Sequence, residues 1–270
     1  MADVDALFAE ISAARTRERR RTRVWQTGIA VFMVGAWQIL SGPVLPSQWF
    51  SNPLAVFMRL QAVLVTENFW LQTGVTLAEM ALGFGVAVPF GTLAGLAYGK
   101  APGFGKIAGP LVIGIYSIPL VALTPLFILW FGLGIMSKAA VVAVSVFWLM
   151  FFNVASGVRR VDADLIAAIR QLGGTRKQEW CWVILPSIAS WFFSGIRLCI
   201  PYSLVGAVVA EMIASSEGLG YLAMRASSFL RMDTLYAIVV LLMVLGVLLN
   251  AFAEWVERYF GRWQPEKEVS

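Results

Sequence analysis

Four polar side chains within the apolar runs of this sequence have the chemistry to contact a solute along a pathway. Ionisable groups in such runs are functional candidates by default. Arg197 could attract an anionic solute, extend to the membrane interface or pair with a carboxylate. For Glu211, structural pairing or gating is favoured over binding of the solute. Glu79 is a possible partner for Arg197 or for Glu211. Asn153 and Ser203 could line the pathway, although hydrogen bonds between helices are the commoner use of such residues.

Catalytic and metal chemistry of the chain's own is not expected. The sequence has no histidine and two cysteines, Cys181 and Cys199. The lack of histidine excludes histidine metal sites and the Ser-His-Asp triad, and two isolated thiols cannot form a metal cluster. The phosphate-binding pattern G-x-x-x-x-G-K-[ST] is absent, because Gly99-Lys100 lacks the upstream glycine and the following hydroxyl. We therefore expect no catalytic residue, no metal and no cofactor in this chain.

The composition indicates that much of the chain lies in a membrane. Of 270 residues, 59% are hydrophobic and 14% charged, against about 45–50% and about 25% in soluble domains. Backbone groups in lipid must be paired within their own segment, so each span should be a helix. We expect an all-α membrane protein with about six transmembrane helices, at residues 24–40, 71–98, 107–131, 139–158, 186–214 and 235–256. A short run at 53–65 is typical of an amphipathic helix at the membrane surface.

Prolines and glycines indicate where these spans bend and pack. Prolines within or beside a span should bend or break its helix locally, and they are Pro89, Pro110, Pro119, Pro125 and Pro201. Gly91, Gly95 and Gly99 repeat every four residues, a spacing that lets another helix approach closely. We interpret this repeat as a packing surface.

The basic residues predict the topology. Six arginines lie between positions 15 and 23, immediately before the first apolar run. Such a run can indicate nucleic-acid binding, but its position favours a cytoplasmic anchor against anionic lipid. We expect a basic cytoplasmic segment at 1–23, one transmembrane domain at 24–260 and a cytoplasmic tail at 261–270. Five basic residues also predict that the loop 159–186 is cytoplasmic: Arg159, Arg160, Arg170, Arg176 and Lys177.

The loop 159–186 is too apolar for a simple linker. Asp162 could cap a helix, and apolar residues then recur at helical spacing, at Leu165, Ile166, Ile169 and Leu172. Gly173 and Gly174 should end that helix. A second short helix is expected at about 176–183, and Pro186 should open the next span. The apolar face could pack on the chain's own membrane domain or bind in a groove of a partner.

The same segment resembles the cytoplasmic coupling loop of type I ABC importer permeases. The family pattern is E-A-A, three residues, G, nine residues, I, one residue, L-P. Ala168, Gly173, Leu185 and Pro186 match it and Val183 occupies the isoleucine position, whereas Ala167 replaces the glutamate and Ile169 the second alanine. Three further stretches, 119–134, 205–212 and 218–221, resemble the branch that imports nitrate, sulfonates and taurine.

The resemblance implies a division of labour among several subunits. The implied partners are a dimer of a separate ATPase that binds ATP and Mg²⁺, a second permease copy and a periplasmic substrate-binding protein. The implied location is a bacterial inner membrane, and no nucleic acid is expected as a partner. Closure of the ATPases would push on the loop and switch the permease pair from inward-open to outward-open. The residues expected to couple to the ATPase are Asp164, Leu165, Ala167, Ala168, Leu172, Gly173, Arg176, Lys177, Leu185 and Pro186.

The solute is left open by the sequence. The resemblance favours a small anion such as taurine, another sulfonate or nitrate, and the alternatives are a vitamin or pyrimidine precursor or an aromatic carboxylate. An ion-coupled secondary carrier is the alternative from another class, but it would favour inverted repeats that this chain does not show. A membrane enzyme would need a nucleophile–base pair or metal ligands, and none converge.

Overall fold

The computed structural model describes residues 2–42, 46, 49–66 and 68–260, and the predicted tail 261–270 lies outside these described residues. Every regular element in this part of the chain is helical, which confirms the all-α fold class. The elements are α1 (Ala2–Leu40), α2 (Pro53–Thr66), α3 (Phe69–Lys100), α4 (Pro102–Tyr116), α5 (Leu120–Phe131), α6 (Ile135–Arg159), α7 (Ala163–Gln171), α8 (Arg176–Gln178), the π-helix η1 (Glu179–Ile184), α9 (Leu185–Ala214), α10 (Leu219–Ser228) and α11 (Met232–Phe260).

Four continuous helices in the described part of the chain are long and apolar enough to span a membrane. They are Phe69–Lys100, Ile135–Arg159, Arg176–Ala214 and Met232–Tyr259. Helices α4 and α5 are long and apolar enough only when taken together, and they meet at an angle of 81°, as in a broken span or a re-entrant loop. The predicted span 107–131 is therefore two helices and not one, and the break lies at Pro119, one of the prolines expected to bend or break a span. Pro119 has no N–H and holds an extended conformation (φ −60°, ψ 122°) at the N-cap of α5, so the helix cannot continue through it.

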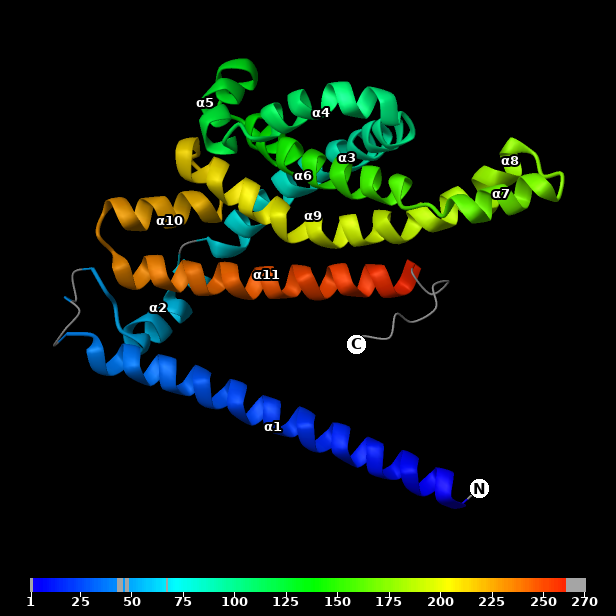
Figure 1. Cartoon of the computed structure of the whole chain (residues 1–270). Helices are drawn as coiled ribbons and strands as arrows, with labels where there is room; N and C mark the ends of the chain where they lie inside the picture. The colour runs from blue at the N-terminus through cyan, green and yellow to red at the C-terminus, as the bar shows by residue number, and fades with distance from the viewer. Residues whose placement is uncertain (1, 43–45, 47–48, 67, 261–270) are drawn as a thin grey trace.

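The first predicted span, 24–40, lies within the long helix α1 but is not among the four continuous spans. Its apolar part is short and follows the arginine-rich half of the helix directly. Figure 1 shows α1 extending away from the other helices and meeting them near α2. There the Trp37 indole N–H donates a hydrogen bond of 2.8 Å to the Ser51 carbonyl. The predicted count of six spans is therefore approximate.

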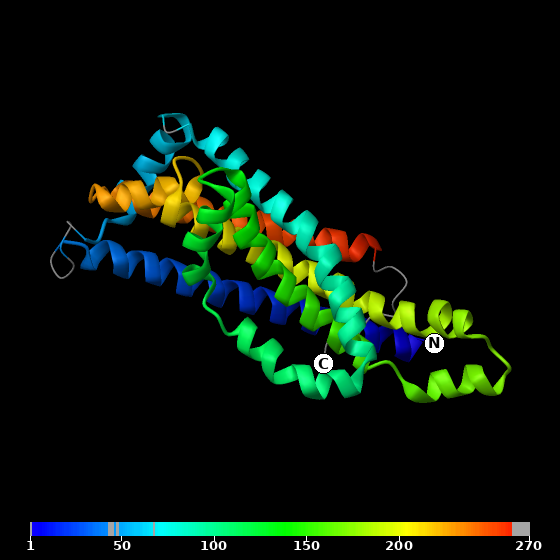
Figure 2. The same ribbon diagram turned by 90° about the horizontal axis from the view of Figure 1, so that it is seen from above.

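Helices α3, α6 and α9 form the centre of the molecule (Figures 1 and 2). The predicted glycine surface on α3 is confirmed as a packing surface against α6. A Cβ atom added at Gly91 would lie 2.9 Å from the Phe147 carbonyl oxygen, and one at Gly95 would lie 2.6 Å from that of Phe151. The facing residues of α6 are fully buried and include Val142, Val146, Met150 and Val154. A second apolar cluster joins α2, α10 and α11.

We expect the substitution Gly95→Val to weaken this packing, because the new side chain would meet backbone atoms of α6 that cannot rotate away. Overpacking of this kind costs about 1–3 kcal/mol of folding free energy. The melting temperature of the purified protein in detergent measures the effect. Gly85→Val is the matched control on the same helix, since a Cβ atom at Gly85 meets nothing within 4 Å. Equal melting temperatures for both variants would contradict the packing role.

Candidate functional site

The loop 159–186 folds as a helical hairpin whose ends are fixed by local signals. The Asp162 carboxylate accepts a hydrogen bond of 2.8 Å from the Asp164 N–H and caps α7, as predicted. Gly173 adopts a positive φ of 76°, and the Gly174 N–H bonds back to the Ile169 carbonyl at 2.9 Å. This geometry ends α7 as the two glycines predicted. A Cβ atom at Gly174 would lie 2.4 Å from the Ile169 side chain, so a larger residue would not fit.

The second helix of the hairpin differs from its prediction. One turn of α-helix, α8, is followed by the π-helix η1 instead of a continuous α-helix over 176–183. Pro186 supplies a physical reason. It has no N–H for the Trp182 carbonyl, and its ring would clash with that carbonyl in an α-helix, so the preceding turn widens. Pro186 lies in the first turn of α9, but the continuous span that contains α9 begins earlier than predicted, at Arg176.

The hairpin projects from one end of the helix bundle, here called the loop end (Figures 1 and 2). Helix α7 has no buried residue. Leu165 is 52% exposed and Leu172 is 87% exposed. All ten residues that the sequence suggested for coupling are exposed: Asp164, Leu165, Ala167, Ala168, Leu172, Gly173, Arg176, Lys177, Leu185 and Pro186. Of the two alternatives left open by the sequence, packing on the chain's own domain is therefore not what this structure shows.

Two interactions that the sequence analysis missed hold the hairpin in place. Arg170 on α7 donates two hydrogen bonds to the Glu179 carboxylate, at 2.7 and 3.0 Å, and so joins α7 to η1. The same bonds raise the pKa of Arg170, chiefly because they stabilise its charged form. At the base of the hairpin, the Lys100 ammonium lies 3.5 Å from the centroid of the Trp180 ring. These two contacts therefore hold α7 against η1, and η1 against the end of α3.

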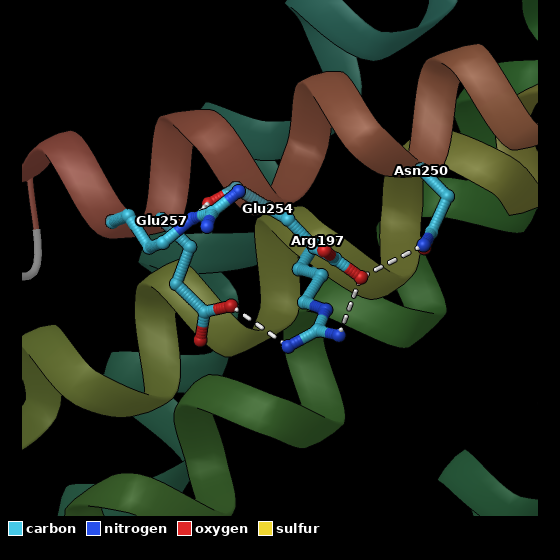
Figure 3. A network of polar contacts seen from close by, with 5 residues as sticks. Arg197, Asn250, Glu254 and Glu257 are labelled. Carbon is cyan, nitrogen blue, oxygen red and sulfur yellow. Dashed lines mark hydrogen bonds and ion pairs between the residues drawn. The ribbon is translucent and has the colours of Figure 1, made fainter. Parts of the chain in front are cut away.

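Arg197 pairs with carboxylates in this structure (Figure 3). Its guanidinium donates to Glu254 at 3.0 Å and to Glu257 at 3.0 Å, both on α11. The Asn250 amide donates to the same Glu254 oxygen at 3.0 Å. Of the three uses that the sequence left open for Arg197, pairing is the one that the geometry shows. The suggested partner Glu79 lies elsewhere, beside Glu211.

Glu211 lies at the end of the bundle opposite the hairpin, here called the far end, where it joins three helices. Its carboxylate accepts a hydrogen bond of 2.7 Å from the Thr76 hydroxyl on α3 and one of 2.6 Å from the Gly220 N–H at the start of α10. The Thr76 oxygen in turn accepts from the Leu219 N–H at 3.0 Å. The first turn of α10 is thus capped by side chains from α3 and α9. Pairing or gating was expected of Glu211 from the sequence, but its partner Thr76 was not.

Two glycines make this close approach possible. A Cβ atom at Gly218 would lie 2.2 Å from the Glu211 carboxyl carbon, and one at Gly220 would lie 2.3 Å from the Val208 carbonyl oxygen. Gly218 also has a φ of 102°, which disfavours any other residue. The stretches 205–212 and 218–221, noted separately in the sequence, therefore form one structural unit.

The other two candidate pathway residues bond within their own helices. Asn153 donates to the Leu149 carbonyl at 2.9 Å, and the buried Ser203 donates to the Ile200 carbonyl at 2.6 Å. The structure thus does not bring Asn153, Ser203, Arg197 and Glu211 into one site. A cavity of about 740 Å³ opens instead at the bend between α4 and α5, against α6 and α9. Its walls include Tyr116, Ser117, Ser145, Trp148 and Tyr202, none of which the sequence analysis had selected.

Comparison with known proteins identifies the family. Residues 87–262 match the family described as the binding-protein-dependent transport system inner membrane component. The chain belongs to this family. The matched region contains the bend, the hairpin, Arg197, Glu211 and Gly220, whereas Thr76, the partner of Glu211 on α3, precedes it. The chain is accordingly a permease of the ABC importer type, a multi-pass transport subunit of the inner membrane.

Two relatives whose names describe transport permeases align with most of this permease. It is 28% identical over 259 residues to a putative aliphatic sulfonates transport permease of Bacillus subtilis, covering 95% of this chain and 94% of that one. It is 26% identical over 232 residues to a formylaminopyrimidine transport permease of Halalkalibacterium halodurans, covering 86% and 92%. Among solved structures, an amino acid ABC transporter with histidines aligns with a TM-score of 0.59 at 19% identity, over 74% of this chain and 97% of that chain. This last similarity shows the fold alone.

Proposed function

We propose that this permease works as a pair of copies bound to two ATPase subunits, and that the hairpin α7–α8 is the surface on which each ATPase binds. The observation that carries the proposal is the hairpin itself. It projects from the bundle (Figure 2), no residue of α7 is buried, and Leu165 and Leu172 are exposed. An apolar helix surface of this kind suits the groove of a partner protein. Its caps and the Arg170–Glu179 pair would let it transmit a push to α9.

The loop end is proposed to face the cytoplasm. Three basic side chains lie there, each over an aromatic ring: Lys100 over Trp180, Arg159 over Tyr98 and Arg160 over Trp191. Basic residues at one end of the spans favour a cytoplasmic location. The start of α1 and the end of α11 lie on the same side of the molecule as the hairpin (Figure 1), which suits two cytoplasmic chain ends. ATP and Mg²⁺ would be held by the ATPase, and a periplasmic binding protein would deliver the solute at the far end.

For the solute, we propose a small organic acid of the sulfonate class. The support is the aliphatic sulfonate permease of B. subtilis, which aligns over almost its whole length. The second candidate is a pyrimidine, as in the permease of H. halodurans. The aromatic walls of the cavity at the bend, Tyr116, Trp148 and Tyr202, suit a flat ring.

Purification of the tagged permease from its host in mild detergent tests the assembly. We expect an ATPase with a Walker motif to co-purify in about equal amount, because the hairpins of two permeases would each bind one copy. Solute uptake by proteoliposomes should then require ATP and should persist when ionophores collapse ion gradients. A permease that purifies without an ATPase, or uptake that follows an ion gradient, would contradict the proposal.

A further inference from the structure

A second cavity lies at the far end, between the first turns of α3, the link from α5 to α6 and the residues after α9. Its volume is about 500 Å³, within the range of about 300–1,000 Å³ that small-molecule sites occupy. Two ionisable side chains on its walls are almost completely buried. Glu79 is 1% exposed and Lys138 is 5% exposed. A third, Glu217, lies at its exposed rim.

The buried charges of this cavity are incompletely paired. One oxygen of Glu79 bonds toward Glu211, but the other has no hydrogen-bond partner among the described residues. The Lys138 ammonium donates to the Leu133 carbonyl and has two further N–H donors. The Lys138 charge attracts the carboxyl groups of both Glu79 and Glu211, but it does not bond to the open Glu79 oxygen within the described part of the chain. Buried polar groups normally form hydrogen bonds. The Glu79 oxygen without a partner and the Lys138 ammonium with a single hydrogen bond, both on the wall of one cavity, therefore require an explanation.

The open groups specify the chemistry of a ligand. Two hydrogen-bonded carboxyl groups share at least one proton, which lies between them, so the open Glu79 oxygen is an acceptor. An ammonium group carries only donors and fits that oxygen. The free donors of Lys138 fit an acid group at the other end of the same molecule. We propose that this cavity binds a solute with an ammonium group and an acid group, the first on Glu79 and the second on Lys138.

Other ligands fit the cavity less well. A solute with only an acid group would meet the carboxyls of Glu79 and Glu217 with one lysine to offset them. A multivalent metal ion would need several ligands, and no group of three or more metal-binding side chains occurs among the residues that the structure describes. The inference rests on the proposed function, in which the far end receives the solute, and it narrows the solute to amino acids or amino sulfonates.

Isothermal titration of the purified complex of permease and ATPase tests the inference. The probes are 3-aminopropanesulfonate and 4-aminobutanoate, each compared with its counterpart without nitrogen, propanesulfonate or butanoate. We expect the amino probes to bind at least about tenfold more tightly, the size of one charge-assisted hydrogen bond. Glu79→Gln should reduce that preference to less than about threefold, while Glu18→Gln, the same change at an exposed position of α1 outside the cavity, should retain it.

Three outcomes overturn the inference: equal binding of the paired probes by the natural complex, no binding of either, or an unchanged preference in the Glu79→Gln variant. If that variant does not assemble, Lys138→Met serves instead. It should lose the preference for 3-aminopropanesulfonate over propylamine, which lacks the acid group, and a retained preference contradicts the inference. ATP hydrolysis is measured on the same samples. A complex that hydrolyses ATP but shows no amine preference contradicts only this inference, whereas absence of the ATPase contradicts the proposed function.

Discussion

Reversal of the two adjacent charges at Arg176 and Lys177 should abolish coupled transport while the permease remains folded. Both side chains are exposed in the single turn of α8, at the point where the ATPase is proposed to bind. A reversed charge at a complementary interface places like charges together, which costs several kcal/mol. We expect the double variant Arg176→Glu/Lys177→Glu to lower ATP-driven uptake by at least about tenfold. The ATPase that remains bound should hydrolyse ATP without uptake.

Uptake and ATP hydrolysis measured on the same proteoliposomes check this result. Arg176→Glu and Lys177→Glu alone should each have an intermediate effect, while Lys106→Glu, an exposed charge on α4 outside the hairpin, should have little effect. The melting temperature of the double variant should stay near that of the natural protein, because surface substitutions usually change stability by less than about 0.5 kcal/mol. Normal coupled uptake in the double variant would show that the hairpin does not contact the ATPase through α8.

The second large effect is expected at Glu211. Glu211→Ala removes the acceptor of two buried donors, the Thr76 hydroxyl and the Gly220 N–H. Each donor left without a partner costs about 1–3 kcal/mol, so the loss should be roughly 2–6 kcal/mol. Because these bonds hold the start of α10 against α3 and α9, we expect a lower yield and a lower melting temperature. Proteolysis should cut more readily in the segment 215–231.

Glu217→Ala is the matched control for this experiment. It removes a carboxylate six residues later in the chain, but from an exposed position, and should change stability by less than about 0.5 kcal/mol. Glu211→Gln keeps one oxygen acceptor and should lie between the two. If Glu211→Ala melted at the same temperature as Glu217→Ala, the network around Glu211 would not be what supports α10.

Features that depend on neighbouring residues were predicted well from the sequence. The cap at Asp162 and the stop at Gly173 and Gly174 involve partners within a few residues, so their types and spacing suffice. The glycine surface of α3 was likewise predicted, although not its partner α6. The four continuous spans were also predicted, because the bilayer imposes length and polarity on each helix separately.

Features that depend on how distant helices meet could not be predicted in this way. Glu211 and Thr76 are 135 residues apart, and nothing in either segment indicates that they face each other. The partners of Arg197 depend on the register of α9 against α11. The bend at Pro119 was expected as a local distortion, but proline alone does not set its angle. The cavity at that bend, and the one beside Glu79 and Lys138, exist only once several helices are in place.

The pairing of Arg197 has a consequence for the order in which the protein is made. Its partners Glu254 and Glu257 follow it by 57 and 60 residues. At about 5–20 residues per second, a ribosome needs roughly 3 to 12 s to reach them. During that interval α9 carries an arginine without its counter-ions, at a cost of roughly 2.5–3.5 kcal/mol if it lies near the centre of the bilayer. The apolar remainder of α9 must outweigh that cost, and Arg197 gains its counter-ions only when α11 enters beside α9.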